Sequence, residues 1–476
     1  MKLFLTSILT LFIVQIGSAQ TTVNGGIYTN TTWTLANSPY RMTGNVVVFP
    51  GATLTIEPGV EVLVKENGNS GGEYYLETRG TINMVGTPSN LITFKSETAP
   101  KMVGAWKGIV VKNSQGGIIN YDYVSITNAI FPVDYDAFVP GFIKLRQSAF
   151  NYNFTGIKVG TEIELDSCSF TGNQIGITGW SIFKLNNCLF DSNTAAVSIY
   201  PSSLFVNNCQ FSGRETDLFL NSSAVNGMTI KNSYFAWNST CIDNPGNGNL
   251  DSCIFSNNKE PVRNATYFNI RNCGFDNNQT AVQVGFGSTV RECEFTLNKT
   301  GIAIGPINFG QPMPIIENNN ICNNELYNID NRTDLNIFIP TNCFCTQDSM
   351  EIERKLLDGY DDITKGLISY AIYDTSCTTI LNVVNKTGAN SLTDVNVKEA
   401  QIQVFPNPAN STITLQYTMP LSSYTISSIL GQEMLTGNIS AIESTQIDIA
   451  TLPAGTYIIA LLGSDQKTTY RKISKQ

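Results

Sequence analysis

The chain has 476 residues, of which 42% are hydrophobic and 14% are charged, a balance typical of folded domains rather than of a disordered polyampholyte. It contains no His, which excludes Ser-His-Asp triads, Cys-His dyads and His-ligated metals. Its formal net charge of -9 argues against a nucleic-acid partner and against binding to anionic membranes by bulk charge.

The first 19 residues have the pattern of a secretory signal peptide. Lys2 precedes an apolar run that extends to Ile16, and small residues follow up to Ala19. We expect cleavage after Ala19, with an uncleaved anchor as the alternative. The apolar run is shorter than the ~20 residues of a comfortable membrane span, so we expect no transmembrane span after cleavage.

The middle of the chain is a repeat with a period close to 20 residues. A small residue, usually Cys, is followed two positions later by Phe, five positions later by Asn and nine positions later by an aliphatic residue. The Cys column comprises Cys168, Cys188, Cys209, Cys253, Cys273 and Cys293, with Ser148 and Ser233 in equivalent places. The Asn column includes Asn173, Asn193, Asn258, Asn278 and Asn298.

This period predicts an all-β right-handed parallel β-helix. Two helices need about 33 residues or more per repeat, whereas 20 residues suit short strands joined by tight turns. Stacking at about 4.8 Å then places like residues above one another, with Phe and aliphatic side chains in the bore and Asn amides at a turn.

The Cys column is interpreted as structural rather than as a redox or metal site. Cys behaves as a small buried hydrophobe, and the rung spacing exceeds the disulfide Cβ separation of about 3.8 Å. The remaining cysteines are Cys241, which falls on the inward small column, and Cys322, Cys343, Cys345 and Cys377. Export permits disulfides, so Cys377 could pair with Cys343 or with Cys345.

Irregular rungs are expected on both sides of the repeat. The strand-like stretches 52–60 and 106–111 resemble the opening rungs of surface proteins of the right-handed parallel β-helix (pectin-lyase-like) superfamily. Residues 349–357 have helical spacing and are expected to cap the last sheet edge, which completes a β-helix domain over 20–377. Asp358, Asp361 and Asp362 could instead form a calcium loop, although they lack the EF-hand spacing; otherwise no cofactor is expected.

Residues 378–398 have the composition of a linker. Residues 399–476 show the strand-like alternation of apolar and polar residues expected for a small β-sandwich. Three motifs stand in this last segment, at 404–409, 431–433 and 452–457, and a fourth, 471–473, near the end. In that order they resemble the type A C-terminal sorting domain of the type IX (Por) secretion system, with Phe405 where Tyr is commoner. The resemblance implies a bacterium of the Bacteroidota, passage through the periplasm, the type IX machinery as the partner of residues 399–476, and release or attachment at the outer surface.

Three functions remain open for the β-helix. Proteins that resemble it include polysaccharide lyases and glycoside hydrolases, but rungs of 20 residues leave almost no long turns to build a catalytic cleft. A glycan- or partner-binding role is favoured, and a purely structural rod is the third alternative. One set of candidate ligand-binding residues is the turn pair Trp180 and Tyr200, which either form an exposed platform for a sugar or pack inside the protein. The other set is Asp134, Tyr135, Asp136 and Phe138, in an expected insertion at 128–141 that either grips a ligand or simply wraps between rungs.

Overall fold

The computed structural model describes residues 20–66, 74–98, 103–135, 142–199, 203–213, 227–243, 245–307, 310–370, 373–374, 377, 402–417, 421–428, 433–439, 444–463 and 468–475. The chain divides into two compact units, Met1–Leu392 and Thr393–Gln476. The predicted signal peptide lies outside the described residues. No helix among the described residues is long and apolar enough to cross a membrane.

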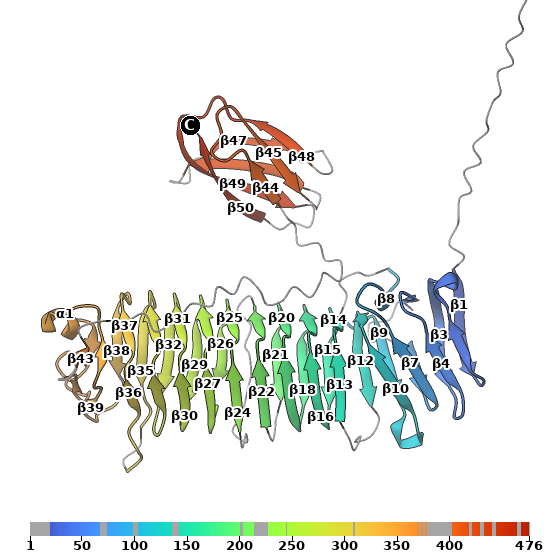
Figure 1. Ribbon diagram of the computed structural model, residues 1–476, viewed down its shortest axis with the longest axis horizontal. Helices are drawn as coiled ribbons and strands as arrows, with labels where there is room; N and C mark the ends of the chain where they lie inside the picture. The colour runs from blue at the N-terminus through green and yellow to red at the C-terminus, as the bar shows by residue number, and fades with distance from the viewer. Residues whose placement is uncertain are drawn as a thin grey trace, which may run out of the picture. The chain divides into compact units, whose positions relative to one another are not determined.

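The first unit is a coil of short strands that pair in parallel with the equivalent strands of the next turn (Figure 1). Among the described residues its largest sheet has 19 strands, and further sheets complete the coil. One nine-stranded sheet contains β13 (Phe142–Arg146), β16 (Glu162–Asp166), β19 (Ile182–Asn186), β22 (Ser203–Asn207), β24 (Met228–Lys231), β27 (Gly248–Asp251), β30 (Phe268–Arg271), β33 (Thr289–Arg291) and β36 (Ile315–Glu317).

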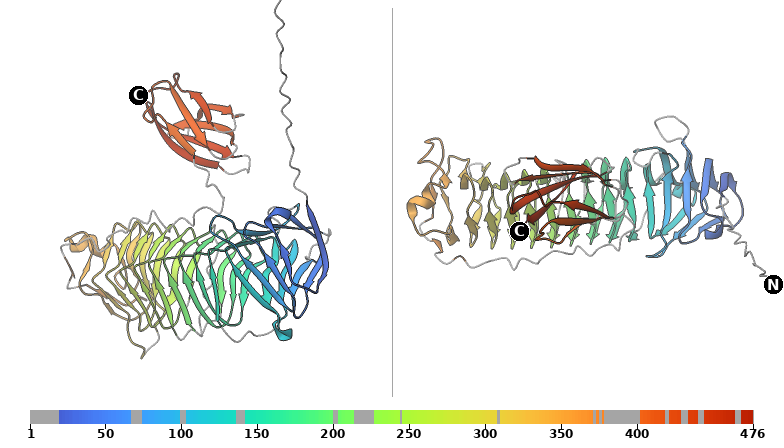
Figure 2. Two further views of the ribbon diagram at one scale, coloured as in Figure 1. Left: turned by 45° about the vertical axis from the view of Figure 1, so that its right-hand side comes forward. Right: turned by 90° about the horizontal axis from the view of Figure 1, so that it is seen from above.

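A further side of the coil carries two sheets. The first is formed by β15 (Thr155–Val159), β18 (Ile175–Gly179) and β21 (Ala195–Ile199). The second is formed by β26 (Thr240–Asp243), β29 (Glu260–Ala265), β32 (Thr280–Val284), β35 (Thr300–Ile304), β38 (Tyr327–Asn331) and β41 (Leu356–Leu357). The early rungs add a four-stranded sheet of β2 (Thr31–Trp33), β4 (Thr53–Ile56), β7 (Thr81–Val85) and β10 (Ile118–Asp122). Figure 2 shows the same stacked strands from two other directions.

The predicted columns are confirmed as ladders. In the 19-stranded sheet, the three-residue strands β14 (Ala149–Asn151), β17 (Ser169–Thr171), β20 (Leu189–Asp191), β23 (Gln210–Ser212), β25 (Tyr234–Ala236), β28 (Ile254–Ser256), β31 (Gly274–Asp276) and β34 (Glu294–Thr296) pair with Phe opposite Phe. Successive rings from Phe150 to Phe295 are stacked at centroid distances of 4.6 to 5.5 Å. These rings are buried in the bore, as the repeat predicts.

The Asn column forms a chain of amide hydrogen bonds along the coil. Asn258 Nδ2 donates to Asn278 Oδ1 at 3.0 Å, and Asn278 Nδ2 donates to Asn298 Oδ1 at 2.9 Å. Each Oδ1 also accepts the backbone N–H of the preceding Asn of the column, at 2.9 Å in both cases. These buried amides satisfy the turn backbone, which explains why Asn recurs at this position.

The corner before each small residue has a left-handed backbone. Ser167, Asn187 and Asn272 have φ values of 57°, 55° and 52°, and each directly precedes a Cys of the ladder. Asn tolerates this region better than most residues, which accounts for the frequent Asn before Cys.

The C-terminal end of the coil differs from the prediction. Helix α1 covers only Ser349–Glu353, and Leu356 and Leu357 form β41, which pairs with β38 and continues the stack. The helix is short because the hydrogen-bonding needs of the open sheet edge favour one more strand over another helical turn. Two disulfides fasten this end: Cys343–Cys377, one of the two predicted alternatives, and Cys322–Cys345, which the sequence analysis did not identify.

The second unit has its own core and two antiparallel sheets. One contains β44 (Ile402–Phe405), β45 (Thr412–Tyr417) and β48 (Ser444–Asp448), and the other contains β46 (Leu421–Ser428), β47 (Glu433–Asn438), β49 (Gly455–Gly463) and β50 (Thr468–Lys475). Ile413, Ile426 and Ile459 are fully buried between them. This arrangement confirms the small β-sandwich.

Candidate functional site

The two predicted platform residues have different outcomes. Trp180 lies between β18 and β19 and keeps 58% of its surface exposed, so its ring is available to a ligand. Tyr200 lies outside the described residues, as do Asp136 and Phe138.

The expected insertion at 128–141 is wrong over its first part. Residues Ala129–Tyr135 form strand β12, which pairs in parallel with β9 (Trp106–Val111), and places Asp134 opposite Val110. Tyr135 packs against the core and its hydroxyl is hydrogen-bonded to that of Tyr121. Burial raises the pKa of Tyr135 to about 12. An alternating apolar segment next to an open strand edge gains more by pairing than by projecting as a loop.

Exposed aromatic side chains instead occur on the outer face of four neighbouring strands, β13, β16, β19 and β22. Alternate residues of these strands point outward, and the parallel register places Lys144 beside Glu164, Glu164 beside Lys184, and Lys184 beside Phe205. The adjacent outward row begins with Phe142 beside Glu162. Phe142 and Phe205 are 51% and 45% exposed.

We call this surface the aromatic–ionic face and define it by Phe142, Lys144, Glu162, Glu164, Trp180, Lys184 and Phe205. Trp180 is included because it is exposed in the turn that leads, through Ser181, into β19. The inward residues of the same strands, such as Ile163, Leu165 and Leu185, are buried and hold the backbone in place. The face is therefore rigid, since its side chains are carried by strands rather than by long loops.

Ion pairs link the charged residues of this face. Lys144 Nζ lies 2.5 Å from Glu164 Oε1, and Lys184 Nζ lies 2.7 Å from Glu162 Oε1. The Lys184 ammonium is also 5.9 Å from the centroid of the Phe142 ring, within the range of a cation–π contact. Donating a hydrogen bond to Glu162 raises the pKa of Lys184 above its ordinary value.

Arg146 and Asp122 border the face with the same kind of pairing. Arg146 Nε and Nη2 lie 2.9 and 2.7 Å from Asp122 Oδ2. This hydrogen bond raises the pKa of Arg146. The cations of this region therefore have carboxylate partners.

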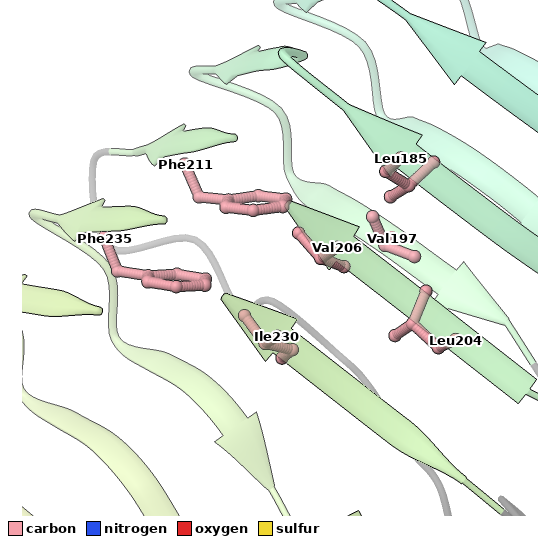
Figure 3. Close-up of a pocket in the computed structure, with 7 residues that line it drawn as sticks. All are labelled: Leu185, Val197, Leu204, Val206, Phe211, Ile230 and Phe235. Atoms are coloured by element: carbon pink, nitrogen blue, oxygen red, sulfur yellow. The ribbon is translucent and has the colours of Figure 1, made fainter. Parts of the chain in front are cut away.

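The cavity beneath this face does not offer a site. It lies on the inward side of β19 and β22, and its lining is entirely apolar (Figure 3). The lining residues are Leu185, Val197, Leu204, Val206, Phe211, Ile230 and Phe235. Such a lining supplies no donor or acceptor to orient a polar ligand.

The Cys ladder has the chemistry of packing. Its members are reduced and buried, and burial raises the pKa of Cys188 and Cys273 well above the ordinary value. The thiols of Cys188 and Cys273 therefore stay protonated at neutral pH and are poor nucleophiles and metal ligands.

The carboxylates of the calcium candidates Asp358 and Asp362 already accept hydrogen bonds within their own segment. Asp358 accepts hydrogen bonds from the backbone N–H groups of Tyr360 and Ile368 at 2.9 and 2.7 Å. Asp362 accepts from both the N–H and the hydroxyl of Thr364, which lowers its pKa. Calcium binding by this turn stays a prediction.

A pair of carboxyl groups that the sequence analysis did not single out lies on the 19-stranded sheet. Asp276 belongs to β31 and Glu294 to the neighbouring β34. Burial raises the pKa of both, and the charge of Asp276 adds to the shift of Glu294. Carboxyl groups on neighbouring rungs could have been found by listing outward positions of the repeat.

The stacked parallel sheets define the first unit as a β-helix, and comparisons with known proteins agree. Residues 173–321 match the family model of the right-handed beta helix region, and residues 25–131 match that of the pectate-lyase like beta helix domain. Residues 403–476 match the secretion system C-terminal sorting domain. A search of curated proteins gives no match to this chain.

The chain is thus a right-handed parallel β-helix protein with a C-terminal sorting domain of the type IX secretion system. The sorting domain shows that the protein is secreted or attached to the outer surface, handled by the type IX machinery. The signal peptide and the assignment to the Bacteroidota stay predictions.

Proposed function

We propose that the protein is a glycan-binding module of the cell surface and that the aromatic–ionic face is its binding surface. The observation that carries the proposal is the presence of three exposed aromatic side chains: Phe142 and Phe205 on the outer face of one sheet, and Trp180 in the turn that leads into the same sheet. Exposed aromatic groups gathered on one face commonly mark a binding surface.

The chemistry of the face suits a carbohydrate. The negative face of an aromatic ring attracts the positively polarised C–H groups of a sugar ring. The carboxylates and ammonium groups beside the rings keep donor and acceptor capacity for hydroxyl groups. Apolar contact combined with a few fixed polar groups is the usual composition of a small-molecule site.

Glycan binding by the purified mature chain tests the proposal. We expect saturable retention on at least one polysaccharide of a panel, and a loss of at least about tenfold in affinity for Trp180→Ala, which corresponds to about 1.4 kcal/mol. Trp237→Ala is the matched control, because Trp237 is 61% exposed but follows β25, outside the face. Equal losses for both variants, or no retention at all, would refute the proposal.

A polysaccharide lyase or glycoside hydrolase is the second candidate, supported by the raised pKa values of Asp276 and Glu294. Glycoside hydrolases use two carboxyl groups, one of them protonated before catalysis. Release of new reducing or unsaturated ends that Asp276→Asn abolishes would favour the enzyme. Binding without turnover favours the module.

A further inference from the structure

The charges of the aromatic–ionic face determine which glycans it can accept. Building on the proposed function, we infer that the ligand is an uncharged polysaccharide and that acidic polysaccharides are excluded. The inference rests on the pairing of the cations, on the net charge of the region and on the way the rings are distributed.

Each ammonium group of the face already has a carboxylate. Lys144 is bound to Glu164, and Lys184 is bound to Glu162. A uronate or sulfate group would have to displace one of these carboxylates and leave it without its cation. Exchange of one anion for another gives little net binding energy, because both anions lose water and make the same kind of contact.

The surroundings of the face add negative rather than positive potential. Arg146 lies beside two carboxylates: it is bound to Asp122 and stands opposite Asp166 in the register, and Asp166 also accepts a hydrogen bond from Asn187 at 2.7 Å. The chain as a whole has a formal net charge of -9. The net negative charge therefore opposes the approach of a polyanion.

The ion pairs nevertheless suit hydroxyl groups. A carboxylate has about four lone-pair sites and an ammonium group three donors, so each pair keeps capacity beyond its own contact. Held on neighbouring rungs, Glu164 and Lys184 present an acceptor and a donor side by side. They can bind the vicinal hydroxyls of a neutral sugar without any change in net charge.

The rings are spread along the stacking direction. Phe142 lies on β13, Trp180 stands two residues before the start of β19, and Phe205 lies on β22. Three rung spacings of about 4.8 Å separate β13 from β22, or about 14 Å. A single monosaccharide cannot reach both ends, so the face accommodates several consecutive residues of a chain that runs along the coil axis.

Affinity electrophoresis of the mature full-length protein tests this inference. The neutral probes are galactomannan, xyloglucan and a soluble β-glucan, and the acidic probes are polygalacturonate and alginate. We expect Trp180-dependent retention by a neutral probe, which changes less than about twofold between about 0.05 and about 0.5 M NaCl because no ionic contact is screened. We expect no retention by the acidic probes.

Glu162→Gln supplies the gain-of-function test. This change removes the carboxylate bound to Lys184 beside the Phe142 ring and makes the face one unit more positive, so we expect new, salt-sensitive retention by polygalacturonate and unchanged thermal stability. Glu292→Gln is the matched control: it frees Arg271 on the same sheet, outside the face, where no exposed aromatic group is paired with it in the register. It should produce no Trp180-dependent retention by polygalacturonate.

The outcomes separate the two proposals. Trp180-dependent, salt-sensitive retention of the unchanged protein by polygalacturonate or alginate would overturn the neutral-ligand inference while leaving glycan binding intact. Failure of Glu162→Gln to gain acidic binding, when neutral binding is present, would also overturn it. No Trp180-dependent retention by any probe would overturn both proposals.

Discussion

Substitution of Asn258 by Asp tests whether the amide ladder holds the rungs together. Asn258 Oδ1 accepts two hydrogen bonds from Asn238, one from its backbone N–H at 2.9 Å and one from its Nδ2 at 3.0 Å. Asn258 Nδ2 faces three oxygen atoms: Phe235 O at 3.0 Å, Ser256 O at 3.2 Å and Asn278 Oδ1 at 3.0 Å. Asp keeps the acceptor and the shape but replaces this NH₂ group with an oxygen.

The expected loss depends on pH. A protonated carboxyl group supplies one hydrogen where the amide supplied two, so one buried acceptor loses its donor at a cost of about 1–3 kcal/mol. Ionisation adds a buried charge beside three oxygen atoms, which raises the pKa of the introduced carboxyl group above its unfolded value of about 3.9. The variant therefore loses further stability as pH rises from the unfolded to the folded pKa, by up to about 1.4 kcal/mol per pH unit.

Urea unfolding followed by near-UV circular dichroism at pH 4 and pH 7 measures this difference. We expect a deficit of about 1–3 kcal/mol at pH 4 and of several kcal/mol at pH 7. Asn249→Asp is the control, because Asn249 is exposed and its Oδ1 only accepts from Asn269; its effect should stay within about 0.5 kcal/mol. Equal deficits at the two pH values, or an equally large effect of the control, would refute the reasoning.

Three further predictions concern the bore and the outer sheet. Phe255→Ala removes a buried ring stacked at 4.6 and 4.9 Å on its neighbours and should lower the free energy of unfolding in urea by about 3–5 kcal/mol. Phe205→Ala, at an exposed position, should lower it far less, and similar losses for the two variants would contradict the bore assignment. Glu294→Gln should raise the thermal midpoint at pH 7 and leave it unchanged near pH 3, because the raised pKa of Glu294 means that the ionised form costs stability only above its unfolded pKa of about 4.3; a gain that persists in acid would contradict it. The 11 cysteines less the four in disulfides leave seven thiols, which are buried, so a thiol reagent should detect seven groups after denaturation and almost none before; rapid reaction of the native protein would contradict the ladder.

The regular part of the coil could be predicted from the sequence because each rung repeats the same physical requirement. Phe190 must fill the bore above Phe170, and Asn193 must accept the backbone N–H of Asn173, which it does at 3.0 Å. A requirement repeated every 20 residues leaves a column that can be read without an alignment. Stacking of like residues is then the only arrangement that satisfies all columns together.

The ends of the coil could not be predicted to the same degree because there the repeat stops. Whether residues 349–357 cap the stack as a helix or extend it as a strand depends on the edge left by β38, which no column in the sequence describes. The disulfide partners depend in the same way on where Cys322 and Cys345 meet in space, with Cα atoms 5.6 Å apart. Four cysteines allow three pairings, and spacing alone does not choose among them.

The candidate site was only partly predictable for a related reason. Trp180 was identified because it lies in a turn, where ligand-binding residues are usually sought, and it is exposed. Phe142 and Phe205 lie within strands, in positions where the alternation of the repeat expects polar residues. The informative signal was an apolar residue in an otherwise polar outward column: Phe205 stands in line with Lys144, Glu164 and Lys184.

This exception bears directly on how a coil with such short rungs can bind a ligand. Turns of minimal length cannot surround a substrate, so recognition must come from side chains on an open sheet. An outward Phe on such a sheet contributes little to the bore and adds a risk of aggregation at the surface. Exposed rings at Phe142, Trp180 and Phe205 are then a cost for a structural rod but useful for a module that lies along a neutral polymer. Loss of glycan retention in Phe142→Ala and Phe205→Ala as well as in Trp180→Ala would show that the rings act along the coil, whereas dependence on Trp180 alone would restrict binding to a single sugar at the turn.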